Sequence, residues 1–411
     1  MTDAENRLSE DERQELDEEE AEQVEAVRPP DLNQESGRSA TRLELFFDLA
    51  FVLFVARCAD VLAKDETWHG AGIFAAVLAV GWWAWASATL YANRFDTDDA
   101  VFRVLTLIAM AGVVAMAAAV DKVTSSTGVW FALGYIAIRL VLVAGYLRAW
   151  RHIPQARPTA RLYLLGHAAG AAIWLVSLAV PAPGRYWLWA VGVAVDLLGP
   201  TAAARLKEAV PLHLEHLPER FGLFVILVLG ESVAATVTGL HDGGWKAPVV
   251  VSAGFAFVVV AALWWVYFDL SGGAAKRRLI AEGGDNTRQG VHDFYVYEHL
   301  PVAVSLAAVA VGLEHAVLHG ADDHLTAGTR WVLGIGAAGY LFSVALLQAG
   351  MGGRIRGAVL WPGAGVPLAL VIAALDLSPV LTLGLLAAVA VAGVLAGFFL
   401  HRAGEVRTAK V

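Results

Sequence analysis

The sequence predicts an all-α, polytopic integral membrane protein with about twelve transmembrane helices, and three observations lead to that fold class. The 411 residues are 57% hydrophobic and 17% charged, with a mean hydropathy of +0.58, which is too apolar for an ordinary soluble protein of this length. Apolar segments long enough to cross about 30 Å of hydrocarbon recur along the chain. The loops between them alternate between many and few basic residues.

Short polar breaks separate the apolar segments, and each segment is long enough to form a membrane-spanning helix. We place the twelve segments at 43–62, 68–90, 101–120, 127–149, 161–180, 185–205, 219–240, 247–270, 294–318, 330–349, 357–376 and 378–401.

The basic residues support this count. The loops after even-numbered segments carry 15 Lys and Arg, among them Arg94 and Arg220, and the loops after odd-numbered segments carry 5. Because positive loops stay in the cytoplasm, the bias predicts a multi-pass protein of the cell membrane with both termini cytoplasmic.

The chain also shows an internal repeat. RLELFFDLAFVLF at 42–54 aligns with RFGLFVILVLGES at 220–232, and each is followed by a segment that ends in tryptophans and a tyrosine. An even number of spans in each half gives both halves the same orientation. We therefore expect two parallel six-helix repeats, at 42–210 and 211–402.

The two ends of the chain are polar. Residues 1–41 hold 14 Asp and Glu against 4 Arg, with few large apolar residues, so we expect a disordered, acidic cytoplasmic tail. Residues 403–411 form a short basic C-terminal tail.

Several classes of function find no support in the sequence. The one cysteine, Cys58, permits neither an intramolecular disulfide nor a metal-thiolate site. No basic patch indicates a nucleic acid partner, and no phosphate loop, nucleophile elbow or HExxH motif indicates an enzyme or a cofactor. The partners we expect are the lipid bilayer and a small solute or ion, with protons as one candidate.

The first segment is unusual because it carries Glu44, Asp48, Arg57 and Asp60 within an apolar helix. A charge at bilayer depth costs about 3 kcal/mol on insertion scales, so such a helix must turn its charges toward other helices. Glu44 lies near the interface, and Arg57 with Asp60 has the spacing of a local ion pair. Asp48 has no such simple explanation.

Three further ionizable residues lie near the middle of predicted helices. Glu231 is in the seventh segment, Arg139 in the fourth and Asp196 in the sixth. Arg139 is a candidate partner for Asp48, Asp196 or Glu231, and one buried network is then possible. Such a network can carry protons or can only fix the packing of the helices, and the sequence leaves both readings open.

The ninth segment adds polar groups at both of its ends. Glu298 and His299 open it, and His299 has a pKa range suited to proton exchange. Glu314 lies near its other end and is a candidate buried acid. The adjoining stretch EHAVLHGADDH is a weak metal candidate, in which the ligands would be His315, His319 and Asp323.

Aromatic and small residues have simpler interpretations. The tryptophans at 82, 83, 85, 264 and 265 lie toward the cytoplasmic ends of their segments, where an interfacial aromatic belt is typical. Gly334, Gly336 and Gly339 indicate close helix packing.

Three stretches together resemble the bacterial low temperature requirement A family. They are LELFFDLAFVLF at 43–54, ERFGLFVILVLGES at 219–232 and YVYEHLPVAVSLAAVAVGLE at 295–314. The resemblance extends over nearly all of the membrane body and leaves out the acidic tail. It implies an integral membrane protein with many spans, and the family's name records a growth phenotype and not a reaction.

The function we expect from the residues is a secondary transporter or permease, proton-coupled if Glu231 or Asp48 titrates. A membrane structural or interaction protein, with every buried charge paired, is the alternative. A lipid-modifying intramembrane enzyme is a further alternative, and it would need a nucleophile or a metal cluster beside a lateral opening.

Overall fold

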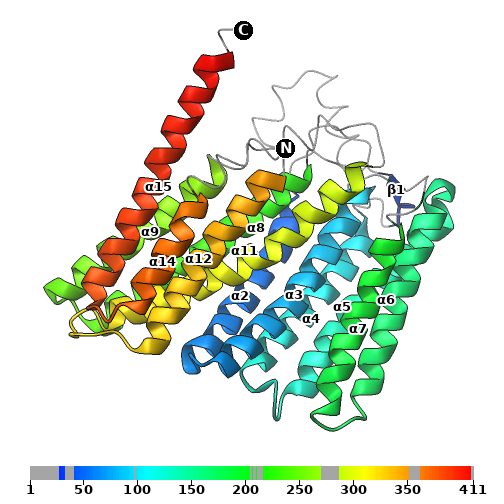
Figure 1. Cartoon of the computed structure of the whole chain (residues 1–411). Coiled ribbons are helices and arrows are strands. Elements are labelled where there is room, and N and C mark those ends of the chain that lie inside the picture. The colour runs from blue at the N-terminus through cyan, green and yellow to red at the C-terminus, as the bar shows by residue number, and fades with distance from the viewer. Residues whose placement is uncertain are drawn as a thin grey trace, which may run out of the picture. The chain divides into compact units, whose positions relative to one another are not determined.

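The computed structural model is nearly all-helical, and it describes residues 27–32, 41–96, 99–203, 206, 210, 216–269, 287–350 and 362–408. Within them lie twelve α-helices (Figure 1). Their bounds are α2 Arg42–Lys64, α3 Trp68–Arg94, α4 Ala100–Ala119, α5 Gly128–His152, α6 Arg157–Ser177, α7 Gly184–Ala203, α8 His216–Gly243, α9 Ala247–Phe268, α11 Thr287–Leu318, α12 Ala327–Gly350, α14 Ala364–Ala374 and α15 Pro379–Thr408.

Each helix coincides with one of the twelve apolar segments expected from the sequence. Eight of them, α3, α4, α5, α8, α9, α11, α12 and α15, are long and apolar enough to cross a membrane. The charged helix α2 is outside this group, as are α6, α7 and the short α14. The fold is therefore that of a membrane protein with several apolar helices.

Within the described residues, the chain departs from the all-α expectation at one short pair of strands. The two-residue strands β1 (Asp31–Leu32) and β2 (Phe95–Asp96) pair antiparallel, with Leu32 opposite Phe95. Short 3-10 turns at Val120–Lys122 and Pro154–Ala156 join neighbouring helices.

Some predicted boundaries move. Helix α15 extends to Thr408, well into the expected basic tail at 403–411. The predicted acidic tail lies mostly outside the described residues, and so do residues 357–361 of the eleventh predicted segment. The internal repeat stays a prediction.

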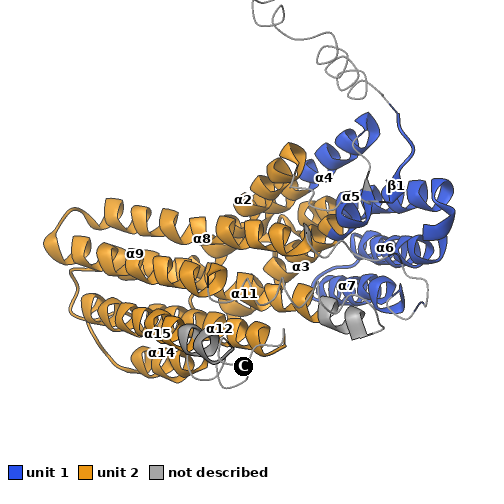
Figure 2. Ribbon diagram, turned by 90° about the horizontal axis from the view of Figure 1, so that it is seen from above, with its two compact units in different colours: residues 1–34, 90–112, 136–211 blue, residues 35–89, 113–135, 212–411 orange. Residues whose placement is uncertain are grey.

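The helices group into two compact units, which are coloured separately in Figure 2. Unit 1 comprises 1–34, 90–112 and 136–211, and unit 2 comprises 35–89, 113–135 and 212–411.

Helix α11 is the centre of unit 2. It packs most extensively against α12 and α8, and it also contacts α2 and α9. Glycines allow the close approach to α12: a Cβ added at Gly312 would lie 2.7 Å from the Cα of Leu333, and one at Gly336 would lie 2.9 Å from the backbone nitrogen of Val309. The close packing predicted at Gly336 is therefore confirmed.

Unit 1 is organised around the tight pair α6 and α7. A Cβ at Gly166 would lie 3.2 Å from the Cα of Gly199, and a Cβ at Gly199 would lie 3.0 Å from the carbonyl oxygen of Leu162. Because both backbones approach so closely, a short polar side chain on one helix can reach the other.

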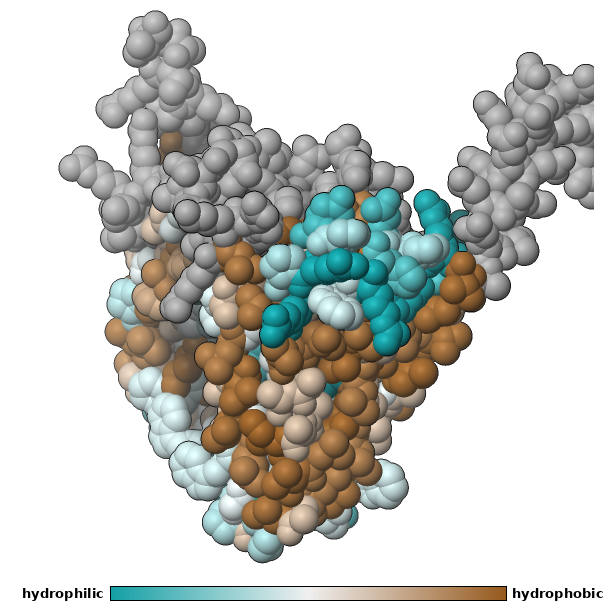
Figure 3. Space-filling view, turned by 90° about the vertical axis from the view of Figure 1, so that its right-hand side faces the viewer, coloured by the Kyte–Doolittle hydropathy of each residue, from teal (hydrophilic) through white to brown (hydrophobic). Residues whose placement is uncertain are grey.

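The surface is rich in large apolar side chains. Figure 3 shows one face of the molecule, on which a broad hydrophobic surface is bordered by a band of hydrophilic residues. Exposed apolar side chains recur along many of the helices, such as Leu107 on α4, Leu165 on α6 and Phe257 on α9. An extended apolar surface is what a lipid environment requires.

Candidate functional site

The candidate site in unit 2 is centred on the carboxylate of Asp48. Its Oδ1 accepts a hydrogen bond of 2.8 Å from the indole Nε1 of Trp85 and one of 2.9 Å from Nη2 of Arg220. The side chain of Asp48 is 0% exposed and that of Arg220 is 2% exposed. Asp48 is on α2, Trp85 on α3 and Arg220 on α8, so the site joins three helices.

Helical periodicity places Asp48 inside the bundle. The buried face of α2 includes Glu44, Phe47, Asp48, Phe51 and Val55, which recur at the spacing of one helix face. Its opposite face, with Phe46, Leu49 and Leu53, is exposed. The carboxylate therefore faces neighbouring helices, and the large apolar side chains face outward.

A histidine from α11 and a tyrosine from α9 lie in the same unit. Nδ1 of His299 is 2.6 Å from the backbone oxygen of Tyr295, and Nε2 is 2.6 Å from the hydroxyl of Tyr267. A carbonyl oxygen can only accept, so Nδ1 carries a proton. In the neutral ring Nε2 then accepts from the Tyr267 hydroxyl, which fixes the tautomer.

Aromatic rings connect the carboxylate to the histidine. Phe221 is in edge contact with Trp85, with ring centroids 4.9 Å apart, and with His299, with centroids 4.8 Å apart. Phe224 stacks on Trp85 at 4.2 Å. The ion pair and the histidine thus belong to one buried cluster, which we call the Asp48 cluster: Asp48, Trp85, Arg220, Phe221, Phe224, Tyr267, Tyr295 and His299.

The ion pair in this cluster is made by one nitrogen and one oxygen. Oδ2 of Asp48, and Nε and Nη1 of Arg220, are buried and have no hydrogen-bond partner among the residues that the structure describes. A buried pair normally repays the cost of desolvation through a full set of hydrogen bonds. The Asp48 cluster therefore keeps both donor and acceptor capacity.

Unit 1 contains a second buried ion pair with a different character. Oδ2 of Asp196 is 3.1 Å from Nη1 of Arg139, and its Oδ1 is 2.5 Å from Nδ1 of His167. All three side chains are at most 1% exposed. Both carboxylate oxygens of Asp196 are used, and the close pair α6 and α7 holds His167 against Asp196.

A further charged contact of unit 1 lies at the start of α4. Asp99 caps this helix by accepting from the backbone N–H of Phe102 at 2.8 Å, and it also accepts from Nη2 of Arg148 at 2.8 Å and from the backbone N–H of Arg28 at 3.1 Å. Burial alone would raise the pKa of Asp99, but these hydrogen bonds and the charge of Arg148 outweigh it, so the pKa lies below its ordinary value.

The sequence pattern of the bacterial low temperature requirement A proteins (LtrA) matches residues 39–396. The chain belongs to this family. It is also similar to an uncharacterized protein of Rhizobium meliloti, with 26% identity over 341 residues that cover 74% of this chain and 81% of the relative. The chain is thus an LtrA-family membrane protein, and this relative has no assigned activity.

The stretches by which the sequence resembles the LtrA family meet at the Asp48 cluster. LELFFDLAFVLF supplies Asp48, ERFGLFVILVLGES supplies Arg220 and its two neighbouring phenylalanines, and YVYEHLP supplies Tyr295 and His299. Segments that are distant in sequence therefore build one site in this LtrA protein.

The predicted ions near the interface have structural partners. Glu44 forms a capping box with Thr41, because its Oε2 accepts from the Thr41 backbone N–H at 2.8 Å and its own N–H donates to Thr41 Oγ1 at 3.2 Å. Arg57 contacts Asp60 at 2.5 Å and Asp121 at 2.7 Å, so the predicted local pair is confirmed.

The remaining acids of unit 2 lie on α8 and α11. Glu231 is half-buried, and the charges of Asp60 and Glu314 act on it. Glu298 is also half-buried and has a hydrogen bond with Ser343. The sequence allowed Arg139 to pair with Asp48, Asp196 or Glu231, and the structure selects Asp196.

The metal candidates are held by other side chains. Nδ1 of His315 is 2.8 Å from Oε1 of Glu66, and Nδ1 of His319 is 2.9 Å from Oδ2 of Asp322. Asp323 is exposed. Across the described part of the chain, no group of three or more metal-binding side chains gathers, and a metal site at this loop stays a weak prediction.

Two sequence interpretations were wrong. Arg220 and Arg94 were counted as loop charges, but both are buried, and Arg94 lies over the ring of Tyr163 at 4.8 Å. Trp82, Trp83 and Trp85 were assigned to an interfacial belt, but all are at most 3% exposed. Residue type and nearness to a helix end do not distinguish a loop residue from a core residue. The signal in the sequence is Asp48, a buried acid that needs a basic partner from another helix, and Arg220 is that partner.

Proposed function

We propose that this LtrA-family protein is a twelve-span secondary transporter or permease of the cell membrane, with both termini cytoplasmic, and that the Asp48 cluster is its coupling site. The observation that carries the proposal is the incomplete ion pair of Asp48 and Arg220. Its side chains are inaccessible, yet the pair leaves one carboxylate oxygen and two guanidinium nitrogens without a partner in the described residues.

Such a pair can respond to a proton. A proton that binds to Oδ2 of Asp48 neutralises the carboxylate, and the net charge of the pair rises from zero to +1. The attraction that holds Arg220 then falls, and its donors become available to a solute or to another acceptor. Protonation is thereby coupled to a rearrangement between α2 and α8, which is what a coupled transporter needs.

The arrangement of α2, α8 and α11 supports a path along these helices. Asp48 on α2 contacts Arg220 on α8. Asp60 lies 12 residues after Asp48, and its charge acts on Glu231, which lies 11 residues after Arg220. The two helices therefore run parallel. Glu314 lies on α11 at the level of Glu231, so ionizable residues occur at two levels, roughly 17 Å apart at 1.5 Å per residue.

Reconstituted liposomes test the proposal. With a pH-sensitive dye inside, addition of a transported solute should change internal pH in wild type. Asp48→Asn and Glu231→Gln should each reduce that flux at least tenfold, because neither amide takes up a proton. Asp121→Asn serves as the control, since Asp121 lies in an ion pair at a helix end with 28% of its side chain exposed.

The outcome that counts against the proposal is also defined. A panel of organic acids, amines, sugars and inorganic ions that moves no protons in wild type would contradict coupled transport. Unchanged flux in Asp48→Asn would contradict the assignment of the site. Size-exclusion profiles and thermal unfolding of each variant show whether a loss of flux reflects loss of the fold.

The alternative function, a membrane structural or interaction protein, is favoured by one observation. In unit 1 both oxygens of Asp196 are taken up by Arg139 and His167, so this pair suits a role in packing. If Asp48 and Asp196 are both structural, neutral variants at the two positions will lower stability alike, and no solute will drive a flux.

A further inference from the structure

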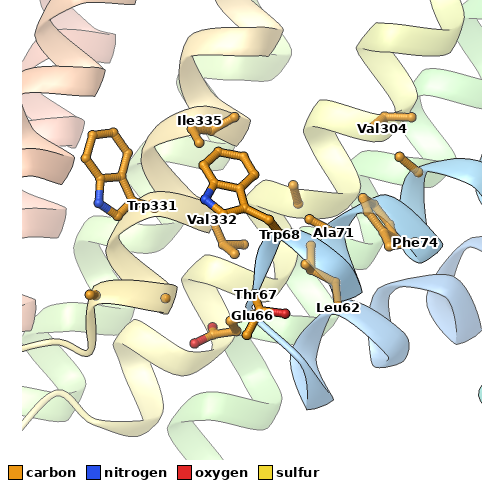
Figure 4. Close-up of a pocket in the computed structure, with 14 residues that line it drawn as sticks. Leu62, Glu66, Thr67, Trp68, Ala71, Phe74, Val304, Trp331, Val332 and Ile335 are labelled. Carbon is orange, nitrogen blue, oxygen red and sulfur yellow. The ribbon is translucent and has the colours of Figure 1, made fainter.

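Unit 2 contains a cavity of about 700 Å³ near the C-terminal end of α2, separate from the Asp48 cluster (Figure 4). It lies where α2 ends and α3 begins, against α11 and the start of α12. Leu62, Ala71, Phe74, Val304 and Ile335 form part of its wall, which is almost entirely apolar. This volume falls within the range of about 300–1,000 Å³ that is typical of sites for small molecules.

One end of the cavity is polar. Glu66, in the turn between α2 and α3, lines this end, with 16% of its side chain exposed. Side chains from α11 and α12 contact its carboxylate. Its Oε1 is 2.8 Å from Nδ1 of His315, and Thr329 Oγ1 is 3.0 and 2.9 Å from its two oxygens. Thr326 Oγ1 is also 3.4 Å from Oε2. A carboxylate offers about four acceptor positions, so these three side chains fix its orientation and leave about one position for another donor.

Neighbouring lysine and arginine side chains pair elsewhere. Lys64 contacts Asp121 at 3.1 Å, and Arg330 contacts Asp376 at 2.6 Å. The titratable group in contact with Glu66 is His315, and the carboxylate stabilises its protonated ring, so the pair has no net charge while that ring is protonated. Above the pKa of His315 the neutral ring donates from Nδ1 without adding charge. With that ring neutral, the polar end of the cavity carries a negative charge.

Two tryptophans flank the cavity. Trp68 is 80% exposed and Trp331 is 41% exposed. In Figure 4 their indoles lie beside Val332 and Ile335, while Glu66 lies at the end away from Ile335 and Val304. The wall from Gly328 to Ile335 on α12 is about 10 Å long at 1.5 Å per residue, which suits an alkyl chain.

We propose that this cavity binds an amphipathic organic cation. The amine or quaternary ammonium head lies at Glu66, because the carboxylate attracts a positive charge. The indoles of Trp68 and Trp331 flank the apolar part of the cavity. The alkyl tail lies along the apolar wall toward Val304. An anionic head of the same length is disfavoured by Glu66. This site does not depend on the proposed transport activity.

Calorimetric titration of the protein in phosphatidylcholine nanodiscs, with empty nanodiscs subtracted, tests the proposal. The probes are decyltrimethylammonium, decyl maltoside and decyl sulfate, which share a tail and differ in the charge of the head. We expect the cation to bind wild type about tenfold more tightly than the neutral probe. Glu66→Gln should reduce that ratio to about one, because it removes the charge and keeps the shape.

Matched variants separate the head from the tail. Asp322→Asn removes an exposed acid from the loop between α11 and α12 and should leave the ratio unchanged. Ala71→Phe fills the wall without touching Glu66 and should weaken the cation at least fivefold, whereas Leu381→Phe, on the exposed surface of α15, should not.

The proposal is overturned if the three probes bind wild type equally, if decyl sulfate binds as tightly as the cation, or if Glu66→Gln keeps the wild-type ratio. Equal binding of all three probes that is lost in Ala71→Phe would instead assign the cavity to lipid tails alone. If Glu66→Gln does not fold, the comparison of probes on wild type and on Ala71→Phe still decides.

Discussion

Replacement of Asp48 by Asn should strongly destabilise the fold. The substitution keeps an oxygen for the hydrogen bonds from Trp85 and Arg220 but removes the negative charge. Arg220 is 2% exposed and then remains in the bundle without its ion-pair partner. Removal of one partner of a buried ion pair costs about 3–5 kcal/mol. That is a large part of a typical stability of about 5–15 kcal/mol.

A double-mutant cycle measures the effect. Asp48→Asn, Arg220→Met and the double variant are compared by reversible unfolding in mixed detergent micelles. We expect the double variant to be more stable than either single variant, because no charge is then left buried. The control pair Arg57 and Asp60 is 45% and 43% exposed, and its loss should cost at most about 1 kcal/mol. Additive effects at positions 48 and 220, or a loss as small as in the control, would refute the reasoning.

Three further predictions concern single positions. Gly199→Leu should destabilise unit 1 by about 1–3 kcal/mol, since its Cβ would lie 3.0 Å from a backbone oxygen of α6, and a lower unfolding midpoint than that of Gly254→Leu checks this. Asp99 contributes stability that is present above its unfolded pKa and lost as pH falls through its lower folded pKa; the fall in stability between about pH 5 and pH 2 should be shallower in Asp99→Asn. Tyr267→Phe removes the donor to Nε2 of His299 and should cost about 1 kcal/mol, with a changed ¹⁵N shift of that nitrogen; an unchanged shift would contradict the tautomer assignment.

The helices could be predicted from sequence because apolar length is a local property. All twelve segments appear as helices, and Glu44 and Asp48 of α2 are buried, as the cost of charge in lipid requires. Arg57 and Asp60, near the end of the helix, are exposed and paired with each other. The pairing of Arg57 with Asp60 was also readable, since both residues lie on one helix three positions apart.

Partners on different helices could not be predicted in the same way. Arg139 has three candidate acids, and only the tertiary fold, which brings Arg139 on α5 to Asp196 on α7, decides among them. Arg220 lies near a helix end, where a basic residue usually faces water, so its burial depends on the position of α2. The sequence also misplaces Trp85, because the apolar ring and single N–H donor of a tryptophan suit both an interface and a buried hydrogen bond, here to Asp48.

The sequence separation within the central ion pair bears on how the protein is made. Arg220 follows Asp48 by 172 residues, which ribosomes translate in roughly 10–30 s. In the proposed twelve-span topology, α2 enters the membrane long before its counter-charge exists, and its acid must be protonated or shielded until α8 arrives. Chains that stop before α8 would keep an uncompensated carboxylate in the bilayer and should be preferred substrates for membrane quality control.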